Sequence, residues 1–253
     1  MRPRSIKIFA AATLCATASV AFSAPTACTA TSGPHLTPVL ELFTSEGCSS
    51  CPPADQWASS LKGKDLVIEA FHVGYWDYIG WVDRFAAPAH TTRQREIAAR
   101  NRLSSIYTPQ VVLNGRDWSD WRRSPVPQPL DAARASITLQ QKGPDQFEAS
   151  VTPLAAGPSG ALPASWSAYW TVTENNHDSK VQAGENAGEF LKHDFVVRQY
   201  IQAGNYHTGD AAAQKLTFRS IAATPGHPRH INLVVFDPQS GQTLQALSLQ
   251  CAV

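Results

Sequence analysis

Glu41-Leu-Phe-Thr-Ser-Glu-Gly-Cys48-Ser-Ser-Cys51-Pro-Pro is the stretch of sequence that decides the expected fold. A short apolar strand, residues 39–43, leads directly into two cysteines separated by two residues, and a helix is expected from Pro53 to about Leu61. Backbone N–H groups and the positive end of that helix favour the thiolate of Cys48. Cys51, one turn further in, can act as the resolving thiol, so the pair permits thiol–disulfide exchange through a mixed disulfide.

The segments after the cysteines predict an alternation of strands and helices. Residues 66–73 are almost continuously apolar, as in a strand covered on both faces. Thr91-Thr-Arg-Gln94 fits a capping box, so a helix is expected to begin there. Residues 110–118 predict a hairpin around an Asn-Gly turn, and the apolar spacing of residues 130–137 predicts a closing helix. This order is typical of an α/β domain with an antiparallel edge.

Thr108-Pro109 makes the cysteine motif more specific, because a Cys-x-x-Cys pair by itself also occurs in metal sites. The dipeptide lies just before a predicted strand, where a cis proline faces the disulfide in a thioredoxin-like fold. There the peptide bond before the proline can pair with an extended substrate backbone, and the proline keeps metal off the thiols. We therefore expect an α/β thioredoxin-like domain over residues 36–142, with Thr108 and Pro109 as substrate contacts.

The residue pattern changes near residues 142–145, from alternating strands and helices to a series of short strands. Over residues 166–173, Trp, Ala, Trp and Val alternate with Ser, Tyr, Thr and Thr, which is the period of two typical of a strand. Residues 181–192 are polar and are expected to form a long loop. The sequence thus predicts an antiparallel all-β, sandwich-like domain over residues 145–253, with further strands over residues 147–151, 195–201, 215–221, 231–236 and 243–249.

Residues 1–24 have the features of an export signal peptide. Arg2, Arg4 and Lys7 precede an Ala-rich apolar run and small residues suited to cleavage, so we expect a periplasmic or secreted protein. No other apolar run is long enough to cross a membrane. Removing the signal leaves 18 of the 21 Lys and Arg residues against 20 acidic residues, which changes the formal charge from +1 to −2. A net charge so close to zero does not indicate a nucleic-acid-binding surface.

Four cysteines remain in an oxidising compartment, where disulfides persist. Cys48 and Cys51 are expected to form a redox-active disulfide, with a permanent structural disulfide and a metal site as alternatives. Cys28 and Cys251 stand at the two ends of the mature chain. Because domain termini often lie close together, a Cys28–Cys251 disulfide is expected; the alternative is two unpaired thiols.

Several side chains near the cysteines have both a chemical and a structural interpretation. Glu46 and Asp55 could relay protons during exchange, although solvated loop and helix-start residues fit the pattern better. His72 or His90 could assist a copper or zinc site, although His72 lies in an apolar strand and fits a core histidine better. Five tryptophans could form a peptide-binding platform or, as the pattern favours, pack in the interior: Trp57, Trp76, Trp81, Trp118 and Trp121.

Five longer stretches carry a resemblance to a known family: ELFTSEGCSSCPPAD, FHVGYWDYIGW, RQREIAARNRL, YTPQVVLNG and GENAGEFLKHDFVVR. With them the chain resembles the uncharacterised, secreted thioredoxin-like family catalogued as domain of unknown function 1223. The resemblance implies a thioredoxin-like fold and an exported protein, and it brings no established activity or substrate. Gly74 departs from the family pattern, which has an acidic residue at that position.

We therefore expect an exported thiol–disulfide oxidoreductase that acts on protein or peptide thiols and needs neither a diffusible cofactor nor a metal. Cys48 is the expected attacking sulfur and Cys51 the resolving one. Two other functions remain open at this point. One is a binding module on a thioredoxin fold whose Cys48–Cys51 disulfide is permanent, and the other is a periplasmic metal chaperone, for example for copper.

Overall fold

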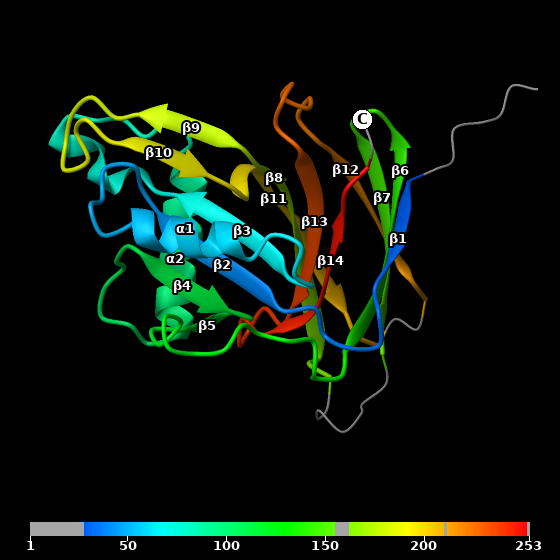
Figure 1. Cartoon of the computed structure of the whole chain (residues 1–253). Coiled ribbons are helices and arrows are strands. Elements are labelled where there is room, and N and C mark those ends of the chain that lie inside the picture. The colour runs from blue at the N-terminus through cyan, green and yellow to red at the C-terminus, as the bar shows by residue number, and fades with distance from the viewer. Residues whose placement is uncertain (1–27, 155–161, 210–211, 252–253) are drawn as a thin grey trace, which may run out of the picture.

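Figure 1 shows the computed structural model of the chain, which describes residues 28–154, 162–209 and 212–251. The predicted signal peptide, residues 1–24, lies outside this described part. Within it, none of the helices has the length and apolar character needed to span a membrane.

The described residues form fourteen strands, two α-helices and one 3-10 helix. The helices are α1 (Pro52–Ser60), α2 (Pro88–Arg100) and the 3-10 helix η1 (Gly74–Ile79). The strands are β1 (Thr29–Thr31), β2 (Val39–Thr44), β3 (Val67–His72), β4 (Gln110–Leu113), β5 (Arg116–Asp117), β6 (Ala135–Gly143), β7 (Gln146–Pro153), β8 (Ser165–Glu174), β9 (His177–Lys180), β10 (Phe190–His193), β11 (Val196–His207), β12 (Gln214–Arg219), β13 (Arg229–Phe236) and β14 (Thr243–Leu249).

One mixed eight-stranded sheet runs through the molecule in the order β14-β13-β8-β11-β3-β2-β4-β5 (Figure 1). Strands β2 and β3 pair in parallel, whereas β4 pairs with β2 in the antiparallel sense. Strand β11 joins the two halves of the sheet. It pairs in parallel with β3 where Val196 lies opposite Ala70, and it pairs antiparallel with β8 along its length. Strands from both halves of the sequence therefore belong to one continuous sheet.

A four-stranded antiparallel sheet, β1-β6-β7-β12, packs against one end of the large sheet (Figure 1). The core between the two sheets is apolar and includes Trp170 of β8, whose ring stacks on Phe218 of β12 with 5.0 Å between centroids. The alternation predicted for residues 166–173 is confirmed. Trp166, Ala168, Trp170 and Val172 all face this core, as the period of two requires.

The two α-helices cover opposite faces of the other end of the large sheet. Leu40 and Leu42 of β2 pack in one apolar cluster with Ala54 of α1. Phe43, whose side chain points to the other face of the strand, packs in a second cluster with Ile97 of α2. The continuous burial of β2 and β3 follows from this double cover.

The predicted fold class, an α/β thioredoxin-like domain followed by an antiparallel all-β domain, is wrong. Strands dominate the described chain, and the largest sheet combines strands from both halves. No helix forms over residues 130–137; they are instead the loop before β6 and the first residues of that strand. Ala133 and Ile137 have helical spacing. Ile137 and Leu139, however, also alternate with exposed Thr138, as in a strand. Residues 135–143 adopt the strand because they pair with β7 along the whole of β6.

A disulfide between Cys28 and Cys251, as the sequence predicts, is present in the structure, with the two Cα atoms 5.8 Å apart. Both residues pack at the edge of the core between the two sheets. The disulfide joins residues that are 223 positions apart, so it fixes the segment before β1 to the segment after β14. A cross-link over so long a loop restricts the unfolded chain strongly.

We expect the double substitution Cys28→Ser and Cys251→Ser to lower the free energy of unfolding by about 2 to 5 kcal/mol. Denaturant unfolding monitored by circular dichroism measures this loss. The pair Cys48→Ser and Cys51→Ser is the matched control, because its cross-link spans only three positions and restricts the unfolded chain much less. An equal loss in both double variants would contradict the chain-entropy explanation.

Two buried carboxylates lie side by side on the face of the large sheet that α2 covers. Glu41 of β2 and Glu69 of β3 are direct neighbours in the parallel register. The guanidinium of Arg93, from α2, forms an ion pair with Glu41 and lies 4.0 Å from the centroid of the Tyr169 ring. Tyr169 and Thr171, both from β8, each donate a hydrogen bond to Glu69. This cluster connects the two halves of the chain through buried polar contacts.

The cluster provides one guanidinium for two carboxylates. Burial and the neighbouring carboxylate of Glu41 raise the pKa of Glu69 to about 7, although Arg93 and the two hydrogen bonds oppose the shift. In the folded protein Glu69 therefore holds its proton up to about pH 7, whereas in an unfolded chain it would ionise near its usual pKa of 4.5.

The free energy of unfolding should therefore fall as the pH rises from about 4.5 to about 7, by on the order of 1 to 3 kcal/mol from Glu69 alone. The fall arises because the folded state binds the proton more tightly than the unfolded state in this range. Glu69→Gln removes the titrating group and should flatten the curve, whereas Glu96→Gln, on the partly exposed side of α2, should not. Denaturant unfolding across this pH range measures the difference, and parallel curves for wild type and Glu69→Gln would contradict it.

Candidate functional site

Cys48 and Cys51 form a disulfide in a tight turn between β2 and α1. The N–H of Cys48 bonds to the carbonyl of Ser45, and the N–H of Cys51 bonds to the carbonyl of Cys48. Cys51 is the N-cap residue of α1, so both sulfurs lie at the positive end of that helix. Only 1% of Cys48 and none of Cys51 is exposed, whereas Ser49 and Ser50 between them are exposed.

A segment from the second half of the chain covers the disulfide. The amide of buried Asn186 donates hydrogen bonds to the carbonyl oxygens of Glu46 (2.8 Å) and Cys48 (3.0 Å). Glu185 accepts a hydrogen bond from the N–H of Ser49. We call residues 181–189, which connect β9 and β10, the cover loop. The sequence predicted a loop over residues 181–192, but Phe190 and the residues after it form β10.

Trp76 connects the cysteine turn to the predicted substrate-contact residues Thr108 and Pro109. Its Nε1 donates a hydrogen bond to the side-chain oxygen of Thr108, at 2.8 Å. On its other side, a Cβ placed on Gly47 would lie only 2.9 Å from the Cβ of Trp76, so glycine is needed for this close approach. The Thr108–Pro109 peptide bond is cis. The side chain of Trp76 thus lies between Thr108 and the cysteine turn.

The tryptophans divide into two groups. Trp57 of α1 packs against Trp121 and Trp118, with ring centroids 4.6 Å and 6.0 Å apart, at the edge of the core that α1 covers. These three have the packing role that the sequence favours. Trp76 and Trp81 instead hydrogen-bond to groups around the cysteine turn, because Trp81 Nε1 donates to the carboxylate of Glu46 at 2.7 Å.

A cluster of buried ionisable side chains lies next to the disulfide. Glu46 precedes the cysteine turn, Asp55 lies in the first turns of α1, and His72 ends β3. The structure adds His193 from the end of β10 and Asp83 from the loop after η1. Neither of these two was singled out from the sequence, and no local pattern marks them, because they reach the cluster only through tertiary packing. Glu46 and Asp55 are buried, contrary to the solvated positions favoured by the sequence.

His193 lies between two carboxylates. Its Nε2 is 3.3 Å from Glu46, and its Nδ1 is 3.9 Å from Asp55; these are ion-pair distances without the alignment of hydrogen bonds. Burial alone would lower the pKa of His193, but Asp55 and Glu46 outweigh it and raise that pKa to about 9. Burial would likewise raise the pKa of Glu46, but the contacts with His193 and Trp81 lower it overall. The three residues thus form a buried charged group.

His72 and His90 have different environments. Nδ1 of His72 lies 2.7 Å from a carboxylate oxygen of Asp83, and its Nε2 is buried without a hydrogen-bond partner. His90 instead contacts the backbone carbonyl of His72 through Nδ1 and packs edge-on against Phe71. Burial lowers the pKa of His90 to about 4, so it stays neutral. His90 is therefore a structural histidine of the core.

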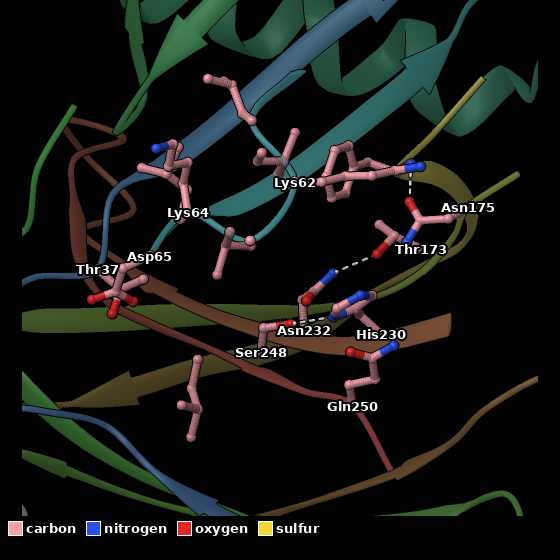
Figure 2. Close-up of a pocket in the computed structure, with 17 residues that line it drawn as sticks. Thr37, Lys62, Lys64, Asp65, Thr173, Asn175, His230, Asn232, Ser248 and Gln250 are labelled. Atoms are coloured by element: carbon pink, nitrogen blue, oxygen red, sulfur yellow. Dashed lines mark hydrogen bonds between the residues drawn. The ribbon is translucent and has the colours of Figure 1, made fainter. Parts of the chain in front are cut away.

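Two pockets matter for the choice of site. One, of about 480 Å³, lies beside the cysteine turn between α1 and the β9–β10 segment; its lining includes Ser49, Pro52, Asp55 and His193. The other, of about 460 Å³, lies where the loop before β3 meets β13 and β14, and Figure 2 shows its polar lining, with His230 bonded to Ser248. None of the residues lining the second pocket belongs to the cysteine turn. Of these two pockets, the first is therefore the one from which a ligand could reach the disulfide.

Fold and site together define a mostly β protein whose mixed sheet presents a Cys-x-x-Cys disulfide at a helix N-terminus, above a buried histidine–carboxylate cluster. Residues 39–236 match the family described as "Protein of unknown function (DUF1223)", so the chain belongs to this family, as the sequence resemblance predicts.

Two solved structures resemble this chain in fold. The first is the crystal structure of protein AGR_C_4864 from Agrobacterium tumefaciens, with 22% sequence identity and a TM-score of 0.63, covering 87% of this chain and 96% of that one. The second is HBP35 of Porphyromonas gingivalis, with 14% identity and a TM-score of 0.52, covering 85% of this chain and 75% of that one. No curated protein matches the sequence. At these identities the likeness concerns the fold alone.

Removing the amide of Asn186 should loosen the cover loop. We expect Asn186→Ala to lower the free energy of unfolding by about 1 to 3 kcal/mol, because the carbonyl oxygens of Glu46 and Cys48 each lose a hydrogen bond. Among the described residues, only the carbonyl oxygen of Cys48 keeps another, from the N–H of Cys51. We also expect dithiothreitol to reduce the Cys48–Cys51 disulfide several-fold faster, which mass spectrometry after alkylation measures. Asn205→Ala, at an exposed position of β11, is the matched control and should change neither quantity. An unchanged reduction rate in Asn186→Ala would show that this loop does not limit access.

Proposed function

We propose that this protein is an exported thiol–disulfide oxidoreductase that exchanges its Cys48–Cys51 disulfide with thiols of proteins or peptides. The observation that carries the proposal is the position of this disulfide at the N-terminus of α1, beside a pocket of about 480 Å³. A helix N-terminus favours the thiolate that exchange requires. The export features of residues 1–24 support a periplasmic or secreted location, where such disulfides persist.

The exchange needs no cofactor, since its electrons move between sulfur atoms. A substrate thiolate attacks Sγ of Cys48, the Cys48–Cys51 bond breaks, and Cys51 keeps the electron pair and takes up a proton. A second substrate thiol then loses its proton and attacks the substrate sulfur of the mixed disulfide, which releases Cys48. The substrate loses two electrons and the protein gains them. The reverse sequence, beginning with attack by the Cys48 thiolate, reduces a substrate disulfide.

The surroundings of the disulfide suggest how a substrate would reach it. Ser49 and Ser50 are exposed, but Cys48 is covered from one side by the hydrogen bonds of Asn186. Movement of the cover loop would open the turn toward the pocket. Thr108 and Pro109, connected to the turn through Trp76, are proposed to contact the substrate backbone. In this proposal the burial of the two sulfurs restricts exchange to substrates that displace the loop.

The same burial favours a second function, a binding module whose Cys48–Cys51 disulfide is permanent. Neither sulfur is accessible while the cover loop is in place. The reduction potential separates the two functions. A potential near those of known oxidoreductases, above about −270 mV, supports exchange, whereas one below about −300 mV is typical of a structural disulfide. Equilibration with glutathione or dithiothreitol buffers, followed by alkylation, measures it.

We expect Cys48→Ser to reduce the rate of insulin reduction or of thiol-peptide oxidation by at least about 100-fold, because the attacking sulfur is gone. Cys51→Ser should instead accumulate a mixed disulfide with a thiol peptide, which intact-mass spectrometry detects. Ser50→Ala is the control: its hydroxyl contacts Sγ of Cys48 at 3.3 Å but takes no part in electron transfer, so the rate should change only a few-fold. Wild-type rates in Cys48→Ser would rule out the mechanism.

A further inference from the structure

The histidine–carboxylate cluster beneath the disulfide has the composition of a metal site. One nitrogen each from His72 and His193 and one oxygen from Asp55 all lie within 4.8 Å of one another. The three residues come from β3, β10 and α1, and at most 6% of any of them is exposed. We propose that this cluster binds a divalent transition-metal ion of the zinc type. The proposal goes beyond the thiol chemistry and does not depend on it.

His72 is oriented as metal-binding histidines are. Its Nδ1 lies 2.7 Å from Asp83, and both side chains are fully buried. Asp83 is itself fixed, because it accepts hydrogen bonds from the backbone N–H groups of Glu46 and Phe85. A carboxylate on one imidazole nitrogen sets the tautomer and leaves the lone pair of the other nitrogen free for a metal. That other nitrogen, Nε2, is buried and has no hydrogen-bond partner.

His193 supplies a second buried imidazole whose nitrogens make no hydrogen bond. Its ring meets that of His72 edge-on, with the centroids 4.9 Å apart. A buried polar atom without a partner costs free energy, so two adjacent histidines in this condition need an explanation. A cation held between them supplies one, because one nitrogen of each histidine then gains a ligand bond.

One carboxylate completes the ligand set, and a second lies beside it. Asp55 provides the third ligand and is oriented by the hydroxyl of Thr44, which donates to its other oxygen at 2.8 Å. Glu46 lies outside this set of three, with its Oε1 3.3 Å from Nε2 of His193, whereas Asp55 faces Nδ1 of the same ring. The fourth position on the ion would therefore be open to water or an external ligand. A divalent cation would take over the charge balance that a protonated His193 supplies between Glu46 and Asp55.

The ligand set indicates the class of metal. Two imidazoles with carboxylates suit zinc and its neighbours among the first-row transition metals, whereas calcium and magnesium prefer oxygen ligands. Ligand atoms around a four-coordinate zinc lie roughly 3.4 Å apart, so the cluster would contract by about 1 Å on binding. Asp55 and His193 also line the pocket of about 480 Å³ beside the cysteine turn, which gives an ion a route to the site.

The sequence predicted no metal, and its alternative placed a metal on Cys48 and Cys51. Apart from His72, which the sequence offered as an assisting ligand, the proposed ligands are different residues and include neither cysteine. The oxidised protein, in which both sulfurs are bonded to each other, therefore tests the proposal directly. Full-length mature protein is treated with EDTA, dialysed and titrated with Zn²⁺ by calorimetry. Titration with Co²⁺ adds a visible absorption spectrum that reports the ligand geometry. We expect one ion per chain and a spectrum typical of four-coordinate cobalt.

Substitutions identify the ligands. His193→Gln and His72→Gln should each weaken Zn²⁺ binding by at least about 100-fold, whereas His230→Gln, in the pocket of Figure 2, should leave it unchanged. Circular dichroism checks that each variant is folded. Asp55→Asn, which keeps the size of the side chain, provides a second test if a histidine variant does not fold. Wild-type affinity in the folded ligand variants, or no stoichiometric binding by the wild type, would overturn the proposal.

The double variant Cys48→Ser with Cys51→Ser separates this site from the thiol chemistry. It should bind Zn²⁺ as tightly as the wild type while it loses exchange activity. Loss of zinc binding in this variant, with binding kept in His193→Gln, would place the metal on the cysteines and overturn the proposal. Exchange activity of the EDTA-treated wild type is measured in parallel, so a failure of the proposed oxidoreductase function and a failure of the metal site give different results.

Discussion

The neighbouring carboxylates of Glu41 and Glu69 impose the constraint on which the rest of the structure depends. Parallel pairing of β2 and β3 puts both on one buried face of the sheet, where two ionised carboxylates would repel, and the pKa of Glu69 is accordingly raised to about 7. The fold accommodates them by packing Arg93 of α2 against Glu41, and by turning Tyr169 and Thr171 of β8 toward Glu69. Because one partner comes from each half of the chain, satisfying these carboxylates requires the two halves to form one sheet. Removing either half would leave one of these carboxyl groups without its partner.

This single sheet also builds the candidate site. The ends of β2 and β3 carry the cysteine turn and His72, and α1 adds Asp55. The connection through β8 and β11 brings β9 and β10 over the same edge, which delivers His193 and the cover loop with Asn186. Disulfide and histidine–carboxylate cluster are thus adjacent because the second half of the chain folds back onto the first. A protein with two independent domains would not need this arrangement.

The sequence predicted several local features well, although the capping box at Thr91 placed the start of α2 too late, since the helix begins at Pro88 after the N-cap residue Ala87. The Cys-x-x-Cys turn before a helix, the hairpin at Asn114-Gly115 and the alternation along β8 all depend on neighbours within a few residues. The prediction failed where a pattern fitted two structures, as at Ile137, whose spacing suits a helix and a strand equally. It also failed for Glu46 and Asp55, because a carboxylate in a loop or a first helical turn is usually solvated. Their burial depends on partners from other segments, such as His193, which lies near both.

What the sequence by itself determined is the local structure of the cysteine turn, a disulfide followed by a helix, and the membership of the chain in its family. The residue types, their spacing of three and the helix that follows are properties of one short segment. What only the tertiary structure decided is the fold class, the covering of the disulfide by Asn186 and the meeting of His72, His193 and Asp55. Their proximity follows from strand order in the large sheet, which depends on pairing between segments more than 100 residues apart. No periodicity within a segment encodes such pairing, so the strand order is known only from the tertiary structure.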